Sequence, residues 1–185
     1  MAFNINDFIS VMKRDGYRPN LFEITLTLPT IVSSQQFTLK AKATAIPSSS
    51  VGTASLFYFG RQAKFAGNRS FDNWTVSVIM DETDFIGFGT RGMFEQWSSL
   101  INSHQGNIRN SGYVSPSVGG GGYYGTGTIT PLGKDGSALG TTYLMQGCYP
   151  IDVGSLPLDW GDNDRIAEFP VTFAYQWWGS AATLI

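Results

Sequence analysis

The sequence predicts a mainly β protein, built as a two-sheet antiparallel β-sandwich or barrel with one flanking α-helix. Three observations favour this class: several segments alternate apolar and polar residues, turn-forming residues separate them, and one longer segment has apolar residues at helical spacing. The 185 residues suffice for one well-packed core. We therefore expect a single domain over residues 1–185.

The first regular pattern predicts a short amphipathic helix near the N-terminus. Asn4 or Asn6 provides a capping side chain, and Gly16 ends the pattern. The apolar residues at helical spacing are Ile5, Phe8, Ile9 and Met12.

Alternating residues predict three strands in the first half of the chain, over residues 20–28, 37–45 and 74–80. Pro47 ends the second strand. In the first and third strands, hydroxyl side chains occupy the face opposite the apolar residues. These hydroxyl residues are Thr25, Thr27, Thr75 and Ser77.

Residues 46–70, between the second and third strands, are expected to form an extended excursion. The excursion contains the run Leu56-Phe57-Tyr58-Phe59, which is followed by Gly60. Both faces of this run are apolar, so it needs cover on two sides, and a partner subunit could supply that cover. An ordinary core strand is the alternative interpretation.

The second half of the chain is expected to contain the main helix, a loop and further strands. The helix falls within residues 85–104 and begins near Arg91, because glycines weaken its first turns. The glycine-rich residues 105–127 are expected to be mobile in a free subunit. A hairpin over 124–131 and 141–149 follows, and a last strand covers 166–177, with Pro170 marking an edge or a bulge.

The composition limits the classes of function. Charged residues make up only 14% and aromatic residues 14%, which suggests that part of the surface meets other protein. The net charge is −2 and the basic residues, Lys40 and Lys42 among them, look like solvated surface, which argues against a dedicated nucleic-acid binder. Cys148 stands alone and is expected in the core. No apolar run is long enough to predict a membrane span.

No motif predicts an enzyme, a metal site or a cofactor site. Gly120, Gly122 and Gly125 match a dinucleotide-binding spacing, but no strand precedes them and no helix follows. His104 is the only histidine. The pair Asp81 and Asp84 could in principle serve acid–base chemistry. Three acids, Asp159, Asp162 and Asp164, lie close together in a predicted turn. Their spacing does not match the calcium-loop pattern, so we expect this turn to be exposed to solvent.

Several blocks resemble the tail tube proteins of contractile-tailed bacteriophages. Residues 18–22 lead into the first strand, and residues 37–47 end in the signature Lys-Ala-Thr-Ala-Ile-Pro. Residues 66–76, AGNRSFDNWTV, are the most diagnostic block, and 149–160 resemble the segment before the last strand. The resemblance covers residues 18–178 in order and departs from the family at the glycine-rich residues 111–127, whose role it leaves open.

The resemblance implies a structural virion protein that forms hexameric rings, which stack into the inner tail tube. Its partners would be further copies of itself, the tail sheath protein, the tape-measure protein, and baseplate and terminator proteins. Phage DNA would pass through without specific binding. The expected location is the virion tail, after assembly in the host cytoplasm, with no membrane, cofactor or catalytic role.

The resemblance also assigns expected roles to individual residues. The excursion over residues 46–70 resembles the family's inter-ring arm. Its candidate contacts are Leu56, Phe57, Tyr58, Phe59 and Arg61. Neutral residues suit a channel that must not hold phosphate, so the candidates to face the lumen are Thr25, Thr27, Thr75 and Ser77. Lys40 and Lys42 are then expected away from the channel.

Other functions remain open at this point. Within the same class, the chain could be a tube-like baseplate or terminator protein, or a tube subunit of a type VI secretion system. From another class, a carbohydrate-binding β-sandwich could present tryptophan platforms for sugars. The tryptophans concerned are Trp160, Trp177 and Trp178, which we expect to be buried.

Overall fold

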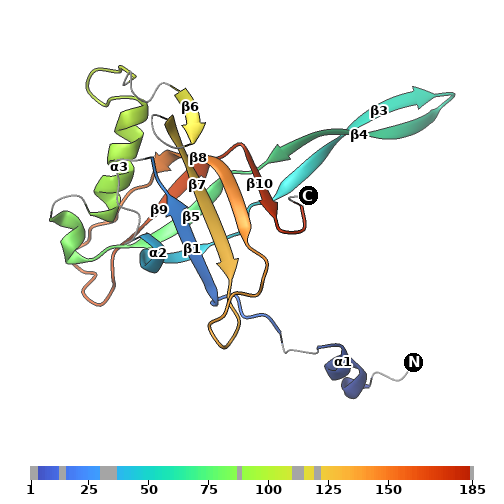
Figure 1. Ribbon diagram of the computed structural model, residues 1–185, viewed down its shortest axis with the longest axis horizontal. Coiled ribbons are helices and arrows are strands. Elements are labelled where there is room, and N and C mark those ends of the chain that lie inside the picture. The colour runs from blue at the N-terminus through green and yellow to red at the C-terminus, as the bar shows by residue number, and fades with distance from the viewer. Residues whose placement is uncertain are drawn as a thin grey trace.

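The computed structural model describes residues 4–12, 16–29, 37–86, 89–109, 115–118 and 122–183 (Figure 1). Its helices are α1 (Ile5–Val11), α2 (Phe37–Lys40), the 3₁₀ turn η1 (Glu82–Phe85) and α3 (Thr90–Ile101). Its strands are β1 (Phe22–Thr27), β2 (Ala41–Thr44), β3 (Ser49–Tyr58), β4 (Arg61–Phe71), β5 (Trp74–Ile79), β6 (Ser115–Val118), β7 (Gly122–Pro131), β8 (Tyr143–Val153), β9 (Glu168–Ala174) and β10 (Trp177–Ser180).

Eight strands form one continuous sheet. Six of them follow the order β1-β7-β8-β9-β5-β2, and the other two, β10 and β6, lie beside this path. β10 pairs with β8, and β6 pairs with β7 in the only parallel pairing among the described strands. The remaining strands, β3 and β4, pair only with each other among the described strands. The prediction of a mainly antiparallel β protein is confirmed. The barrel alternative is wrong, because among the described strands the order ends at β1 and β2, which do not pair with each other.

The two halves of the sheet are joined through β8, which pairs with β7 and β10 along its first part and with β9 along its second. Gly147 marks the change of partner, with a φ of +71° that favours glycine. A Cβ at this position would also lie 2.8 Å from a side-chain carbon of Gln176. The bulge at Gly147 therefore bends one sheet into two facing halves.

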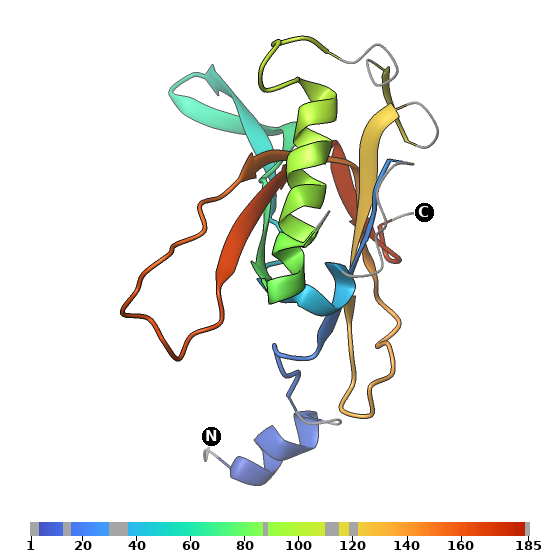
Figure 2. The same ribbon diagram turned by 90° about the vertical axis from the view of Figure 1, so that its left-hand side faces the viewer.

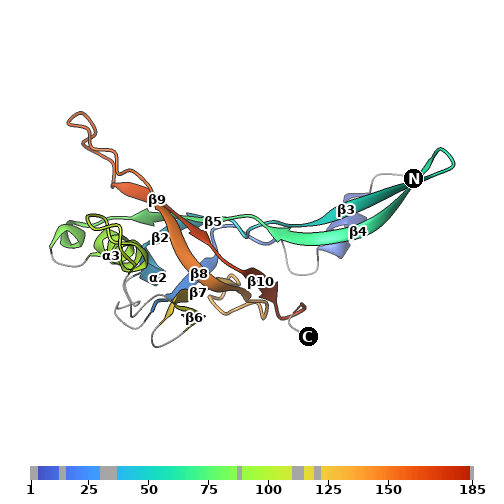
Figure 3. The same ribbon diagram turned by 90° about the horizontal axis from the view of Figure 1, so that it is seen from above.

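The core lies between these halves, and α3 covers their open side (Figures 2 and 3). α3 contributes Met93, Phe94 and Trp97, all buried, and its predicted start near Arg91 is confirmed. The indole nitrogen of Trp97 donates a hydrogen bond to the carbonyl of Tyr123 at 2.9 Å, which fixes the helix against β7. The sheet residues of this core are Ile24, Leu26, Trp74, Val76, Val78, Ile129, Met145, Cys148, Phe169, Val171 and Phe173.

Glycines in β7 make room for two of the core tryptophans. A Cβ on Gly127 would lie 2.5 Å from the Trp74 ring, and one on Gly125 would lie 2.8 Å from Trp97. Both distances are shorter than any contact a real Cβ makes. Residues 122–127 of the glycine-rich region therefore belong to β7, whereas a loop was expected there; mobility of the region in a free subunit stays a prediction. Residues 110–114 and 119–121 lie outside the described part of the chain.

The second predicted strand begins later than expected. Residues 37–40 form the short helix α2, and only Ala41–Thr44 are extended. α2 contacts β1, β2 and β5, so it occupies the gap between the two ends of the sheet. Because residues 37–40 are helical, the side chain of Lys40 points towards Asp81 and Asp84 instead of solvent. The alternating pattern in the sequence did not predict this orientation.

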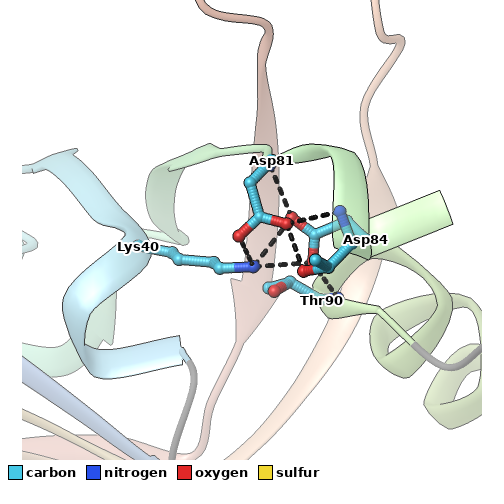
Figure 4. Close-up of polar contacts among 5 residues, drawn as sticks. Lys40, Asp81, Asp84 and Thr90 are labelled. Atoms are coloured by element: carbon cyan, nitrogen blue, oxygen red, sulfur yellow. Dashed lines mark hydrogen bonds and ion pairs between the residues drawn. The ribbon is translucent and has the colours of Figure 1, made fainter. Parts of the chain in front are cut away.

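Lys40 is held by two aspartates in a part-buried ion cluster (Figure 4). Its ammonium group lies 2.8 Å from both carboxylate oxygens of Asp84 and 2.8 Å from an oxygen of Asp81. Asp84 is fully buried and also accepts hydrogen bonds from the backbone amides of Asp81 and Thr90. The cluster thus joins α2, η1 and the first residue of α3, and the prediction that Lys40 is solvated is wrong.

The remaining elements are close to their predicted places. α1, β1 and β5 form where expected, and the side chain of Asn4 caps α1. The hairpin of β7 and β8 is confirmed. The last predicted strand is divided at Tyr175 and Gln176 into β9 and β10, and Pro170 lies in an interior strand between β5 and β8, so it marks no edge.

Candidate assembly surfaces

The hairpin of β3 and β4, residues 49–71, extends away from the rest of the molecule and is called the arm below (Figures 1 and 3). Every residue from 50 to 70 is exposed. The prediction of an extended excursion is therefore confirmed, and the alternative of a core strand is wrong. At its base, the Tyr175 hydroxyl donates a hydrogen bond to the Asp72 carbonyl, so the arm starts from a fixed point.

The arm ends in a two-residue turn whose geometry is unusual for its sequence. Tyr58 pairs with Arg61, and the two residues between them have positive φ values, 45° for Phe59 and 79° for Gly60. Turns of this kind suit the twist of a hairpin and favour Asn-Gly. Phenylalanine in the left-handed region is strained. The chain thus keeps an aromatic side chain at a position where Asn would be relaxed.

The predicted contact residues gather at this tip. Phe59 is 91% exposed, and its ring lies 4.5 Å from that of Tyr58 in an edge-to-face arrangement. Leu56 and Phe57 are exposed as well, and so is Phe65 on β4. A soluble monomer rarely exposes so many large apolar side chains on one hairpin, so the tip has the character of an interaction surface.

The arm also has a one-sided charge. It carries three basic residues, Arg61, Lys64 and Arg69, and no acidic one. Arg69 donates a hydrogen bond to the Ser49 hydroxyl at 3.3 Å. The rest of the chain holds the other nine basic and all fourteen acidic residues, a net charge of −5. A cationic arm is therefore attached to an acidic molecule.

The face of the sheet opposite the core is rich in hydroxyl groups and is called the hydroxyl face below. Thr25 and Thr27 are exposed on β1, as is Thr75 on β5, and Ser77 is half-buried. Thr75 and Thr172 of β9 have their hydroxyl oxygens 3.2 Å apart. Thr126, Thr128 and Thr130 extend the face along β7. The four predicted lumen residues thus lie on the outer side of the bent sheet, Thr25 and Thr27 on the half with β7, and Thr75 and Ser77 on the half with β9.

The sheet has unpaired outer strands at both ends. Among the described strands, β1 pairs only with β7, and β2 pairs only with β5. Each therefore has one side whose backbone groups are open to pairing with another chain. Neither strand contains proline, the residue that most directly prevents such pairing.

The loop between β8 and β9, residues 154–167, is called the acidic loop below; its acids were predicted to be solvated, but a role in assembly was not predicted from the sequence. Trp160 is completely exposed, which contradicts its expected burial, and Leu158 and Ile166 are exposed beside it. Trp177 is marginally exposed and Trp178 is half-buried against Tyr143. The three tryptophans therefore do not share one environment, as a sugar platform would need.

The carboxylate pair considered for acid–base chemistry has a structural partner instead. Asp81 and Asp84 bind Lys40, so they do not face a cleft as an acid–base pair would. Burial raises the pKa of the Cys148 thiol to about 12. Within the described ranges, no three His, Cys, Asp or Glu side chains are grouped to hold a metal ion. None of the described helices has the length and apolar character to cross a membrane.

The fold is shared with chains in solved structures of contractile injection systems. The cryo-EM structure of an extracellular contractile injection system, a PVC sheath–tube complex in the extended state, matches with a TM-score of 0.61 at 16% identity. The match covers 93% of this chain and 95% of that chain. The tube-terminating cap of the anti-feeding prophage matches with a TM-score of 0.63 at 16% identity, covering 97% and 98%.

The sequence comparisons define the family. The family model for phage tail tube proteins matches residues 17–181. Tail tube protein gp19 of Enterobacteria phage T4 is 32% identical over 164 residues, covering 89% of this chain and 91% of the relative. The tail tube protein of Serratia phage KSP90 is 24% identical over 177 residues, covering 92% and 93%. The chain belongs to the phage tail tube protein family, a structural family of the virion tail.

Proposed function

We propose that this chain polymerises as stacked six-subunit rings that form the inner tail tube, through which phage DNA passes during ejection. In this proposal residues 1–185 act as one tail tube domain. Its further partners would be the sheath, tape-measure, baseplate and terminator proteins, and assembly would take place in the host cytoplasm. The observation that carries the proposal is the arm, with its exposed apolar tip outside any core.

The arm supplies the contact between rings in this proposal. Its tip residues need cover that the chain itself does not provide, because Leu56, Phe57 and Phe59 are far from the core. Burying a phenylalanine side chain contributes about 2 kcal/mol. Six arms per ring multiply a modest contact, so a stable tube is compatible with a subunit that stays soluble alone.

Within a ring, we propose that neighbouring sheets meet edge to edge. Strands β1 and β2 lie at the two ends of the strand order, so a head-to-tail ring could pair one end with the other. Closing such a ring leaves no open sheet edge. The sheet that is open in one subunit would then become part of a closed wall.

The hydroxyl face is the proposed lining of the lumen. Thr25, Thr27, Thr75 and Ser77 carry no charge, and phosphate is bound chiefly by clustered Lys and Arg. The two lysines near this region are neutralised: Lys40 by its aspartates, and Lys42 by Glu168 at 2.7 Å. A lining of this kind lets DNA slide without being held.

Electron microscopy of the purified protein tests the proposal. At high concentration we expect hollow tubes with six-fold symmetric end views. The variant Phe57→Asp places a charge in the apolar tip, and we expect it to remain a folded monomer that makes no long tubes. Phe85→Asp, which adds the same charge at an exposed position off the arm, serves as the control and should leave tube length unchanged.

Two results would contradict this function. Wild-type protein that stays monomeric at every concentration and salt condition would refute the tube itself. Tubes of normal length from Phe57→Asp would refute the role of the arm while leaving the tube in place.

A tube-terminating or baseplate ring is the second candidate, because a terminating cap shares this fold with a TM-score of 0.63. The match to tail tube proteins over nearly the whole chain favours the tube subunit. The two differ in whether rings elongate: a terminator purified alone should give single rings, whereas a tube subunit should give stacks.

A further inference from the structure

We infer that the arm of one subunit docks on the acidic loop of another copy, through its aromatic tip and its basic residues. This inference rests on the proposed function, since it names the receiving surface for the arm. The two segments lie on opposite sides of the molecule, the arm at one end of its long axis and the acidic loop towards the other (Figures 1 and 3). A contact between them is therefore made between copies and not within one.

Apolar side chains without cover are the first observation. On the arm, Phe57 and Phe59 are exposed, and on the acidic loop Trp160 has no contact that shields it from solvent. Leu158 and Ile166 are exposed on the same loop. Two uncovered apolar segments on one chain would each be buried if they met, and tryptophan is among the side chains enriched at the energetic centre of such contacts.

Charge complementarity is the second observation. The arm carries Arg61, Lys64 and Arg69 and no acid, whereas residues 154–167 carry three aspartates and a single arginine. That arginine, Arg165, lies closer to Glu168, at 3.3 Å, than to Asp162, at 4.0 Å. Most of the negative charge of the loop is therefore available to interact with another chain.

Both segments keep charged side chains that form no ion pair within the described part of the subunit. Among the described residues, no ion pair is formed by Arg61, Lys64 or Asp164. Asp159 uses one carboxylate oxygen to accept the amide of Gly161, which shapes the turn. Opposite charges on two exposed surfaces speed their encounter and set the register of the contact.

The symmetry of such a contact suits a growing polymer. The arm and the acidic loop are different surfaces, so the interface is heterologous: each copy uses its arm on one neighbour and offers its loop to another. A heterologous contact repeats without limit when it does not close on itself. Stacking of one ring on the next needs an interface of this type.

Charge reversal and its repair test the inference. We expect Arg61→Glu/Lys64→Glu and Asp162→Lys/Asp164→Lys each to raise the critical concentration for assembly at least tenfold, measured by sedimentation. Combining all four changes restores attraction, so the combined variant should assemble within a few-fold of wild type. Asp7→Lys/Glu82→Lys makes the same change in charge as the loop reversal, on exposed residues elsewhere, and should assemble normally.

A cross-link tests the contact directly. Gln62→Cys places a thiol beside the arm tip, and Asn163→Cys places one in the acidic loop; the native Cys148 is buried. Mild oxidation of the assembled double variant should give a ladder of covalent multimers in denaturing gels, and neither single variant should. All variants should unfold at the temperature of the wild type, because none of these residues is in the core.

The results separate this inference from the proposed function. If wild type assembles but the loop-reversed variant assembles equally well, or the combined variant assembles no better than the arm-reversed one, the acidic loop is not the receiving surface and the tube stands. If wild type does not assemble at all, the proposed function itself fails.

Discussion

At the scale of single residues, Lys40 is the side chain on which three elements depend. Its hydrogen bonds to Asp81 and Asp84 connect α2 to η1 and to the start of α3. Burial alone would lower the pKa of Lys40, but these hydrogen bonds outweigh it, and its pKa is raised. Burial would likewise raise the pKa of Asp84, and the hydrogen bonds from Lys40 and from two backbone amides lower it instead.

We expect Lys40→Met to lower the free energy of unfolding by about 3 kcal/mol, because it leaves the buried carboxylate of Asp84 without its counter-charge. Urea unfolding of the monomer would measure this loss. The control is Lys42→Met, which removes a more exposed ion pair with Glu168 and should cost less than about 1 kcal/mol. Equal effects of the two changes would show that the cluster contributes no more than a surface pair.

The same cluster predicts how stability depends on pH. The hydrogen bond from Lys40 holds the pKa of Asp81 at about 2, and the pKa of Asp84 is lowered as well. Carboxylates with lowered pKa values stabilise the fold above the pKa of the unfolded chain, about 4, and lose this contribution as the pH falls towards 2. The unfolding free energy of wild type should therefore fall between about pH 4 and pH 2. Urea titrations should show a shallower fall in Lys40→Met.

Gly127 gives a third prediction at this scale. Gly127→Ala places a methyl group 2.5 Å from the Trp74 ring, so the core must shift, at a cost of about 1 to 3 kcal/mol. Gly92→Ala in α3 is the matched control: its Cβ meets nothing within 4 Å, and alanine in a helix stabilises by about 0.5 to 1 kcal/mol. Thermal unfolding and near-ultraviolet circular dichroism of the tryptophans would compare the two variants.

At the scale of elements, the alternation of apolar and polar residues predicts those strands that have one face on the core. β1 and β5 fall within one or two residues of the predicted bounds because Ile24, Leu26 and Val76 repeat with a period of two. The start of α3 is equally clear, since the glycines before it weaken a helix. The hairpin of β7 and β8 follows from its turn residues.

Elements whose form depends on distant partners could not be predicted in this way. Residues 37–45 alternate like a strand, but residues 37–40 form α2, and its Lys40 binds Asp81 and Asp84, more than forty positions later. The glycines of β7 look like a flexible loop, yet Gly125 and Gly127 are small because two tryptophans occupy the space beside them. Local patterns carry no sign of either contact.

The assembly surfaces were predicted unevenly for the same reason. The arm is visible in the sequence because Leu56 to Phe59 are apolar on both faces in polar surroundings. The acidic loop has no such pattern, and Trp160 was expected to be buried as most tryptophans are. Only the three-dimensional structure shows that Trp160 is exposed, whereas Trp74 and Trp97 are buried.

Hydrogen exchange tests how the glycine-rich region divides. Thr126 and Gly127 pair with β1 on one side and β8 on the other, so their amides should exchange slowly even in the free subunit. Residues 50–70 of the arm are exposed on both faces and should exchange much faster, and then slow on assembly. Rapid exchange across 122–127 in the monomer would contradict their place in β7.

At the scale of the whole molecule, the uncharged hydroxyl face leads to a prediction about the affinity of the proposed tubes for DNA. Assembled wild type should not bind short duplex DNA, as measured by fluorescence anisotropy. Thr25→Lys/Thr75→Lys would line the proposed lumen with positive charge, and its tubes should bind DNA with an affinity that falls steeply with salt. Gln96→Lys, on α3, is the control and should leave DNA unbound. Equal binding by both variants would place the hydroxyl face away from the channel.

The charge of the arm also affects newly made chains before any tube exists. A two-stranded hairpin whose edge strands have unpaired backbone groups is prone to pair with other hairpins and aggregate. Two such ribbons that approach each other here carry three positive charges apiece and no negative ones, and they repel over a distance of about 10 Å at moderate salt. We therefore expect two arms to repel each other, whereas an arm and an acidic loop attract. This repulsion would reduce aggregation of newly synthesised subunits at high concentration.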